Sequence, residues 1–169
     1  MLIAEMPARS LELLQRMPIF GALRDDSLLL LLSHARSVDI RAGDYFFREN
    51  DEASSMFVLE RGTVAVIKGW QGQEFLIRHL EAGDCFGEMA LMDLCPRSAS
   101  VRAEQDCRAI EFGTDDLLQL YERDVEQFAL IQMNIGREVC RRLRATDERL
   151  YQVTMGEQQS GLETLFLDA

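Results

Sequence analysis

Seven short runs rich in Val, Ile and Phe lie between residues 38 and 112, and Gly, Asp or Asn residues separate most of them. Runs of this length, bounded by turn signals, predict β-strands rather than helices. Because strands joined by short turns pair antiparallel, the series predicts an antiparallel β-roll or sandwich. The runs are VDI, YFFRE, SMFVLE, TVAVIK, EFLIRHL, SASVRA and CRAIEF.

A repeated pentapeptide refines this prediction. The sequence AGDYF at residues 42–46 returns as AGDCF at residues 82–86. Both copies place a glycine turn before a strand, which predicts two equivalent corners of the β-structure. A jelly roll has two such pseudo-equivalent halves. The expected fold class is therefore mainly β with flanking helices, and the expected core is an antiparallel jelly-roll β-barrel over residues 36–113.

The segments on both sides of the predicted roll carry helical patterns. Residues 1–35 form the expected N-terminal helical segment, and residues 114–153 the expected C-terminal helices. Apolar positions recur there at spacings of three and four, as on one face of a long helix. They are Phe128, Ile131, Ile135, Val139, Leu143, Thr146, Leu150 and Val153.

This long helix predicts a partner for part of its apolar face. At about 1.5 Å per residue, a helix over residues 121–153 is roughly 50 Å long, more than so small a roll can cover. We expect a homodimer through residues 125–153, with a lid folded over the chain's own pocket as the alternative. The last segment, residues 154–169, is expected to be a loose tail rather than a short docking helix.

Charge and composition exclude several partner classes. The formal net charge of −11 disfavours nucleic acid and anionic membranes, although one local arginine can still attract a small anion. The apolar run LLLLL at residues 28–32 is far too short to cross a bilayer and predicts one buried helix face. The four cysteines lack CxxC spacing, and the two histidines are isolated. We therefore expect reduced thiols, no metal or cofactor, and a cytoplasmic protein.

One stretch combines an acid and a base with small residues. It reads FGEMALMDLCPRSASV and covers residues 86–101, hereafter the cassette. Gly87 lets the backbone approach another group closely, and Glu88 and Arg97 could each hold one end of a ligand. The alternative is that these two side chains simply pair with each other on the surface.

The cassette resembles the phosphate-binding cassette of cyclic nucleotide-binding domains, which occur in the regulatory subunit of protein kinase A and in the bacterial catabolite activator protein. The resemblance extends to MFVLERGTVAVIKGWQGQEFLIRHLEAGD before the cassette and to RRLRATDERL in the long helix. It covers about residues 10 to 153. It implies the β-roll fold and a cyclic nucleotide ligand, cAMP, with cGMP as the alternative.

The resemblance also implies roles for the cassette residues. Arg97 would pair with the cyclic phosphate, a monoanion, in a charge-assisted hydrogen bond. Glu88 would accept a hydrogen bond from the ribose 2′-hydroxyl, and Ser98 would give its amide and hydroxyl to the phosphate. The other cassette residues expected to line the ligand are Phe86, Gly87, Met89, Ala90 and Ala99.

The base would meet residues outside the cassette. The resemblance implies Val66 and Ile77 in the pocket with Arg78 at its rim, and it places Thr146 and Asp147 of the long helix against the base. Val64, on the same strand as Val66, is expected to be core. Thr146 matches the family pattern, whereas Asp147 replaces a serine. Since a carboxylate accepts hydrogen bonds from adenine or guanine donors alike, the choice of base stays open.

The resulting functional hypothesis is a receptor module without catalytic activity, which binds cAMP and signals through its long helix to a protein effector that the sequence does not identify. A DNA-binding regulator of the catabolite activator type is an alternative. It is disfavoured because residues 154–169 are too few for a helix-turn-helix domain. A scaffold that binds no ligand, or a cyclic dinucleotide, is the third class.

Overall fold

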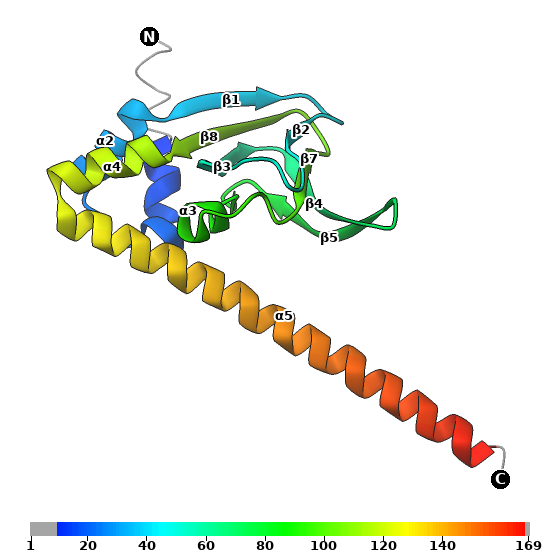
Figure 1. Ribbon diagram of the computed structural model, residues 1–169. Helices are drawn as coiled ribbons and strands as arrows, with labels where there is room; N and C mark the ends of the chain where they lie inside the picture. Colours follow the sequence, from blue (N-terminus) through cyan, green and yellow to red (C-terminus); the bar gives the residue numbers. More distant parts are fainter. Residues whose placement is uncertain (1–9, 168–169) are drawn as a thin grey trace. The chain divides into compact units, whose positions relative to one another are not determined.

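The computed structural model describes the backbone of residues 10–167 and the side chains of residues 10–155. The chain divides into two compact units, Met1–Ile135 and Gly136–Ala169, and each is described by itself below. Unit 1 holds all the strands and the shorter helices, and the long helix α5 (Val125–Leu167) runs from unit 1 into unit 2 (Figure 1).

Two antiparallel four-stranded sheets form the body of unit 1 and confirm the predicted jelly roll (Figure 1). The first sheet has the order β1 (Arg36–Ile40), β8 (Cys107–Gly113), β3 (Ser55–Arg61) and β6 (Cys85–Phe86). The second has the order β2 (Tyr45–Phe47), β7 (Ser100–Ala103), β4 (Thr63–Trp70) and β5 (Gln73–Glu81). The AGDCF corner predicted a strand at this point, and β6 confirms it, although two residues are too few to show the alternation of a strand.

The two AGD corners have the same geometry, as their repetition predicts. Gly43 has a φ of 90° and Gly83 a φ of 95°, the left-handed region that favours glycine. In the first corner, the amide of Gly43 donates to Ala103, and the amide of Ala103 donates to Asp44, at 2.8 and 2.9 Å. The second corner makes the same two bonds, at the same lengths, with Leu59. The two halves of the roll are therefore pseudo-equivalent.

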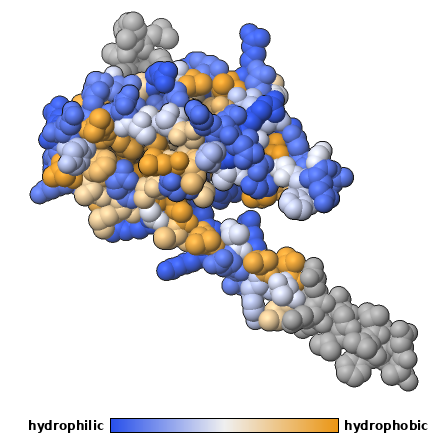
Figure 2. All heavy atoms as spheres, viewed as in Figure 1, coloured by the Kyte–Doolittle hydropathy of each residue, from blue (hydrophilic) through white to orange (hydrophobic). Residues whose placement is uncertain are grey.

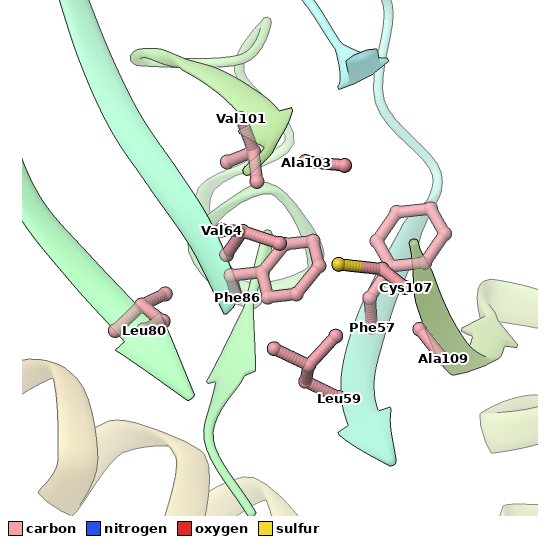
Figure 3. Packing of buried hydrophobic residues seen from close by; sticks show 9 residues of the cluster. All are labelled: Phe57, Leu59, Val64, Leu80, Phe86, Val101, Ala103, Cys107 and Ala109. Carbon is pink, nitrogen blue, oxygen red and sulfur yellow. The ribbon is translucent and has the colours of Figure 1, made fainter. Parts of the chain in front are cut away.

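Aromatic rings fill the space between the sheets. The rings of Phe57 and Phe86 stack with their centroids 5.4 Å apart, and Phe46 meets Phe86 edge-on at 5.0 Å. Figure 3 shows Phe57 and Phe86 among the aliphatic side chains of the same cluster, which includes Leu59 and Val64. Each fully buried ring contributes about 1.5–3 kcal/mol of burial free energy. The cluster therefore fixes the position of β6 and, with Phe86, the start of the cassette.

Short helices close one end of the roll. Residues 10–16 are helical and are followed by η1 (Pro18–Phe20) and α2 (Asp25–His34). In α2, Leu28 and Leu31 are buried and Leu29 is exposed, so LLLLL is one buried helix face, as predicted. Helices α3 (Met89–Asp93) and α4 (Thr114–Arg123) follow β6 and β8. In the part of the chain that the structure describes, no helix has the length and apolar character needed to cross a membrane.

The first turns of α5 are anchored in unit 1 by buried amide side chains. Gln127 accepts a 2.7 Å hydrogen bond from the amide of Arg24, and Asn134 donates a 2.8 Å bond to the carbonyl of Gly21. Ile131 and Ile135 are almost completely buried beside them. The predicted apolar seam therefore begins as part of the core.

Unit 2 continues the helix further than the sequence predicted. The loose tail expected at residues 154–169 is wrong for its backbone, because α5 runs to Leu167. The segment contains no proline, and its glycines weaken a helix without ending it. Residues 168–169 lie outside the described part of the chain. Leu143, Leu150 and Val153 on the predicted seam are 59%, 65% and 59% exposed.

Candidate functional site

Gly87, the second residue of the cassette, has a conformation and a space that only glycine fits. Its φ is 80°, in the left-handed region. A Cβ atom added there would lie 2.6 Å from Nη1 of Arg97 and 3.3 Å from both the Phe47 ring and the Ser55 carbonyl oxygen. The backbone at Gly87 thus packs directly on the guanidinium, which is the close approach that the sequence predicted for this glycine.

The side chain of Arg97 is buried rather than displayed on the surface. The residue is 5% exposed, and its guanidinium carbon lies 4.0 Å from the centre of the Phe47 ring. Nη1 donates to the carbonyl oxygens of Ser55, at 2.7 Å, and Gly87, at 3.0 Å. Nη2 donates to the hydroxyl of Ser55 at 3.2 Å. These contacts fix the guanidinium in place.

One edge of this guanidinium is not used by any of these contacts. Among the described residues, Nε of Arg97 is buried and has no hydrogen-bond partner. A buried donor without a partner costs about 1–3 kcal/mol, so it points to a missing acceptor. The Nε edge also carries the second N–H of Nη2, and two parallel N–H groups match two oxygens of a phosphate or carboxylate. The arrangement therefore suits an anion.

Burial and the neighbouring charges shift the pKa of Arg97 in opposite directions. Burial lowers the pKa of its guanidinium, while the carboxylates of Glu111, Asp51 and Glu88 raise it. An arginine keeps its charge through shifts of this kind, because its ordinary pKa is far above neutral. The site thus holds a permanent cation in a largely dry environment, where its attraction for an anion is stronger than in water.

The second half of the cassette is fastened to the loop between β2 and β3. The amide of Arg97 donates to Asp51, and the carbonyl of Arg97 accepts from Asn50, both at 2.9 Å. From β4, the ammonium of Lys68 donates a 2.6 Å bond to the carbonyl of Ser98. The backbone of Arg97 is therefore held from both sides, so its side chain enters the site from a fixed point.

The remaining predicted cassette residues differ in exposure. Glu88 is 2% exposed and immediately precedes α3, and Ala90 in α3 is also buried. Met89 is 43% exposed, and the exposed Ser98 hydroxyl lies 4.0 Å from its sulfur. Ala99 is half-buried. The structure thus brings Glu88 into the buried part of the site and leaves Ser98 accessible to a ligand.

The predicted pocket residues outside α3 lie partly in the core. Phe86 is 2% exposed and belongs to the aromatic cluster, so its side chain packs in the core between the sheets. Val64 is fully buried core, as predicted, and Val66 packs against the same cluster while staying half-buried. Arg78 pairs with Val66 across the ladder, and Ile77 lies at the adjacent β-bulge, 51% exposed.

Thr146 and Asp147 belong to unit 2. The hydroxyl of Thr146 donates to the carbonyl of Arg142 one turn earlier in α5, at 2.9 Å, and both residues are exposed. Their contact with the base of a ligand stays a prediction.

Sequence reasoning missed the residues that surround the guanidinium. Ser55 and Phe57 come from β3, Phe47 from β2 and Glu111 from β8, and none of them belongs to the cassette. A weak signal was present for Ser55, because a small hydroxyl residue opens the otherwise apolar run SMFVL. The run itself does not show that Ser55 contacts Arg97.

Comparison with known proteins identifies the family of this chain. The family model of the cyclic nucleotide-binding domain matches residues 37–124. The cAMP-dependent protein kinase regulatory subunit of Emericella nidulans is 29% identical over 107 residues, which are 63% of this chain and 26% of that protein. The cAMP-activated global transcriptional regulator CRP of Salmonella typhimurium is 29% identical over 128 residues, 75% of this chain and 59% of that protein. The chain thus spans less than two thirds of either relative.

Solved structures give the same result. The catabolite activator protein of Thermus thermophilus has a TM-score of 0.71 and 29% identity, covering 81% of this chain and 63% of that one. A cyclic nucleotide-binding domain from Methylobacillus flagellatus has a TM-score of 0.76 over 86% of this chain and 82% of its own, and at 23% identity it supports the fold alone. With the jelly roll, the cassette and the family match in agreement, this chain belongs to the cyclic nucleotide-binding domain family.

Proposed function

We propose that this chain is a receptor module whose ligand is cAMP, with cGMP as the alternative. The observation that carries the proposal is the buried Nε of Arg97, which has no partner among the described residues. A cyclic phosphate is a monoanion whose two free oxygens match the two N–H groups of the Nε edge. Relatives named for cAMP and for cGMP both match this chain, which supports the class of ligand more strongly than its base.

The other cassette residues fit the remaining polar groups of a cyclic nucleotide. The carboxylate of Glu88 lies close enough to Arg97 to act on its charge, and a carboxylate can accept a hydrogen bond from the ribose 2′-hydroxyl. The Ser98 hydroxyl is exposed beside the cassette helix and can reach the phosphate. For the base, we propose the half-buried Val66 and the exposed Ile77, with Arg78 at the rim.

The proposed activity is binding without chemical conversion. Hydrolysis of a phosphodiester needs a group that activates water beside the phosphorus. Arg97 is a permanent cation and cannot serve as a base, and Glu88 would be engaged by the 2′-hydroxyl. We therefore propose that the bound nucleotide acts as a signal, which the chain passes to a protein effector.

A melting assay with a panel of nucleotides tests this function. Saturating cAMP is expected to raise the melting temperature, since a ligand at about 100 times its Kd stabilises by roughly 2.7 kcal/mol. Losing the 2′-hydroxyl should make 2′-deoxy-cAMP a weaker ligand, because Glu88 would lack its donor. A shift with cGMP alone, or with a cyclic dinucleotide alone, would identify a different ligand. No shift with any of them would leave the scaffold hypothesis.

We further propose that two copies of this chain associate through residues 125–153. The exposed Leu143, Leu150 and Val153 continue a seam whose earlier positions Ile131 and Ile135 are buried. Figure 2 shows hydrophobic residues exposed between hydrophilic ones on the described part of α5. Burial of a large apolar side chain is worth about 1.5–3 kcal/mol, so a matching seam on a second copy would stabilise a dimer.

Light scattering of the wild type and of Leu143→Glu tests the dimer, with and without cAMP. The wild type is expected to be dimeric at tens of micromolar, and Leu143→Glu to dissociate because a charge would be buried in the seam. Ala145→Glu, which introduces the same charge at an exposed position outside the seam, serves as the control and should stay dimeric. A wild type that is monomeric in both conditions would favour the lid hypothesis instead.

The proposed compartment is the cytoplasm. All four cysteines lie in the described part of the chain, and none of them forms a disulfide there. Thiols of this kind persist in a reducing compartment. The net charge of −11 also favours a protein effector over nucleic acid.

A further inference from the structure

We infer that Ser55 is a positioning residue of the nucleotide site, whose hydroxyl and carbonyl oxygens together turn the Nε edge of Arg97 toward the phosphate. The inference rests on the proposed function, because it assigns a role in the same site. Ser55 itself does not contact the ligand in this arrangement. It acts through the arginine.

The geometry of the guanidinium carries this inference. Nη1 donates to the Ser55 carbonyl at 2.7 Å and Nη2 donates to the Ser55 hydroxyl at 3.2 Å, so one residue accepts from both terminal nitrogens. A guanidinium is planar and its five N–H groups point in fixed directions. Fixing the end formed by Nη1 and Nη2 therefore also fixes the direction of the edge formed by Nε and Nη2.

The anchor is itself rigid. Ser55 is 7% exposed and is the first residue of β3, where it pairs with Gly113 of β8. The ring of Phe47 covers one face of the guanidinium at 4.0 Å and resists tilting out of the plane. A short side chain at the start of a paired strand has few alternative positions, so its hydroxyl is a fixed acceptor.

Removing the hydroxyl would leave the carbonyl anchor and change only one of the two contacts. Nη2 would then lose its partner in a buried environment. The guanidinium, still held by the hydrogen bond from Nη1 to the Ser55 carbonyl, could then rotate about that bond and bring Nη2 to another acceptor. This rotation would move the Nε edge. A phosphate would still be attracted by the charge, but it would no longer be held at two defined oxygens.

The two diastereomers of a phosphorothioate report on this orientation. In Rp-cAMPS and Sp-cAMPS, sulfur replaces one or the other exocyclic oxygen of the phosphate. Sulfur is a poorer acceptor than oxygen, so a fixed pair of donors discriminates between the two ligands. A residue that only supports the fold would change the affinity for both ligands by the same factor, whereas a positioning residue changes their ratio.

Calorimetric titration of cAMP, Rp-cAMPS and Sp-cAMPS into the wild type and three variants tests the inference. Ser55→Ala is expected to weaken cAMP binding about tenfold and to bring the ratio of the two diastereomers toward one. Ser55→Thr keeps the hydroxyl and suits a strand, so it is expected to restore both within about threefold. Ser54→Ala is the matched control, because Ser54 is the exposed neighbour, and it should bind like the wild type.

Three outcomes would overturn the inference while the proposed function stands. They are a wild type that binds cAMP without distinguishing the diastereomers, a Ser55→Ala variant with the wild-type ratio, and a Ser55→Thr variant that is not rescued although its melting temperature is normal. If Ser55→Ala does not fold, Ser55→Cys takes its place, because sulfur fills the site but accepts weakly. A wild-type ratio in Ser55→Cys would also overturn the inference. Failure of the wild type to bind any cyclic nucleotide contradicts the proposed function itself.

Discussion

Replacing Arg97 by lysine is expected to weaken cyclic nucleotide binding by about 1–3 kcal/mol, the cost of leaving a buried hydrogen-bonding group without its partner. Lysine keeps the positive charge but has no planar fork. It cannot donate to Ser55 and Gly87 while also presenting two parallel N–H groups to the phosphate. Isothermal titration with cAMP measures the change.

The lysine variant is preferable to alanine because Arg97 is also part of the packing. Truncation to alanine would remove buried contacts with Phe47 and Ser55 and would lower stability together with affinity. Arg108→Lys is a suitable control, since Arg108 is a half-exposed arginine paired with Asp39 on the roll. Near-native affinity of Arg97→Lys would show that the phosphate is bound elsewhere.

Changing Gly87 to alanine is expected to abolish ligand binding at micromolar concentrations and to lower the melting temperature. The left-handed backbone alone costs a residue with a Cβ about 1–2 kcal/mol. The new Cβ would also lie 2.6 Å from Nη1 of Arg97, so either the guanidinium or the cassette backbone must move. Thermal melting separates the loss of stability from the loss of affinity, which titration measures.

Gly83→Ala separates the two effects, because it introduces the backbone strain without the contact with Arg97. Gly83 has a φ of 95°, similar to the 80° of Gly87, but a Cβ there would have no neighbour within 4 Å. Both variants should therefore lose similar stability from backbone strain, whereas only Gly87→Ala should lose the ligand. Equal ligand affinity in the two variants would contradict the packing of the glycine on the arginine.

Local signals were enough to predict the roll and its two AGD corners. Strands such as β3 and β4 carry their own pattern of β-branched and aromatic residues, and the AGD corners carry their own glycine. The seam of α5 was also visible, because its period is a property of the helix alone. These features depend on residues that are close together in the sequence.

Features that depend on distant residues could not be predicted in this way. The place of β6 in the sheet depends on the stacking of Phe86 on Phe57 and on pairing with β3, and the two residues of β6 do not show this partner by themselves. The inward direction of Arg97 likewise depends on Ser55 and Phe47, more than forty residues earlier. A single sequence does not show which of many serines will meet a given arginine.

The two pseudo-equivalent corners have a consequence for how the site could arise at all. Each corner strand leads into a connection: β2 into residues 48–54, and β6 into the longer residues 87–99. The two connections meet, since Asn50 and Asp51 bond to the backbone of Arg97.

Strand pairing also links the two halves of the roll, β1–β4 and β5–β8. Strand β2 of the first half pairs with β7 of the second, and β6 of the second half pairs with β3 of the first. Neither half-roll contains a complete set of contacts to the guanidinium. The proposed ligand site thus depends on both halves of the roll, and a separated half would contain the cassette sequence without the contacts that hold its arginine in place.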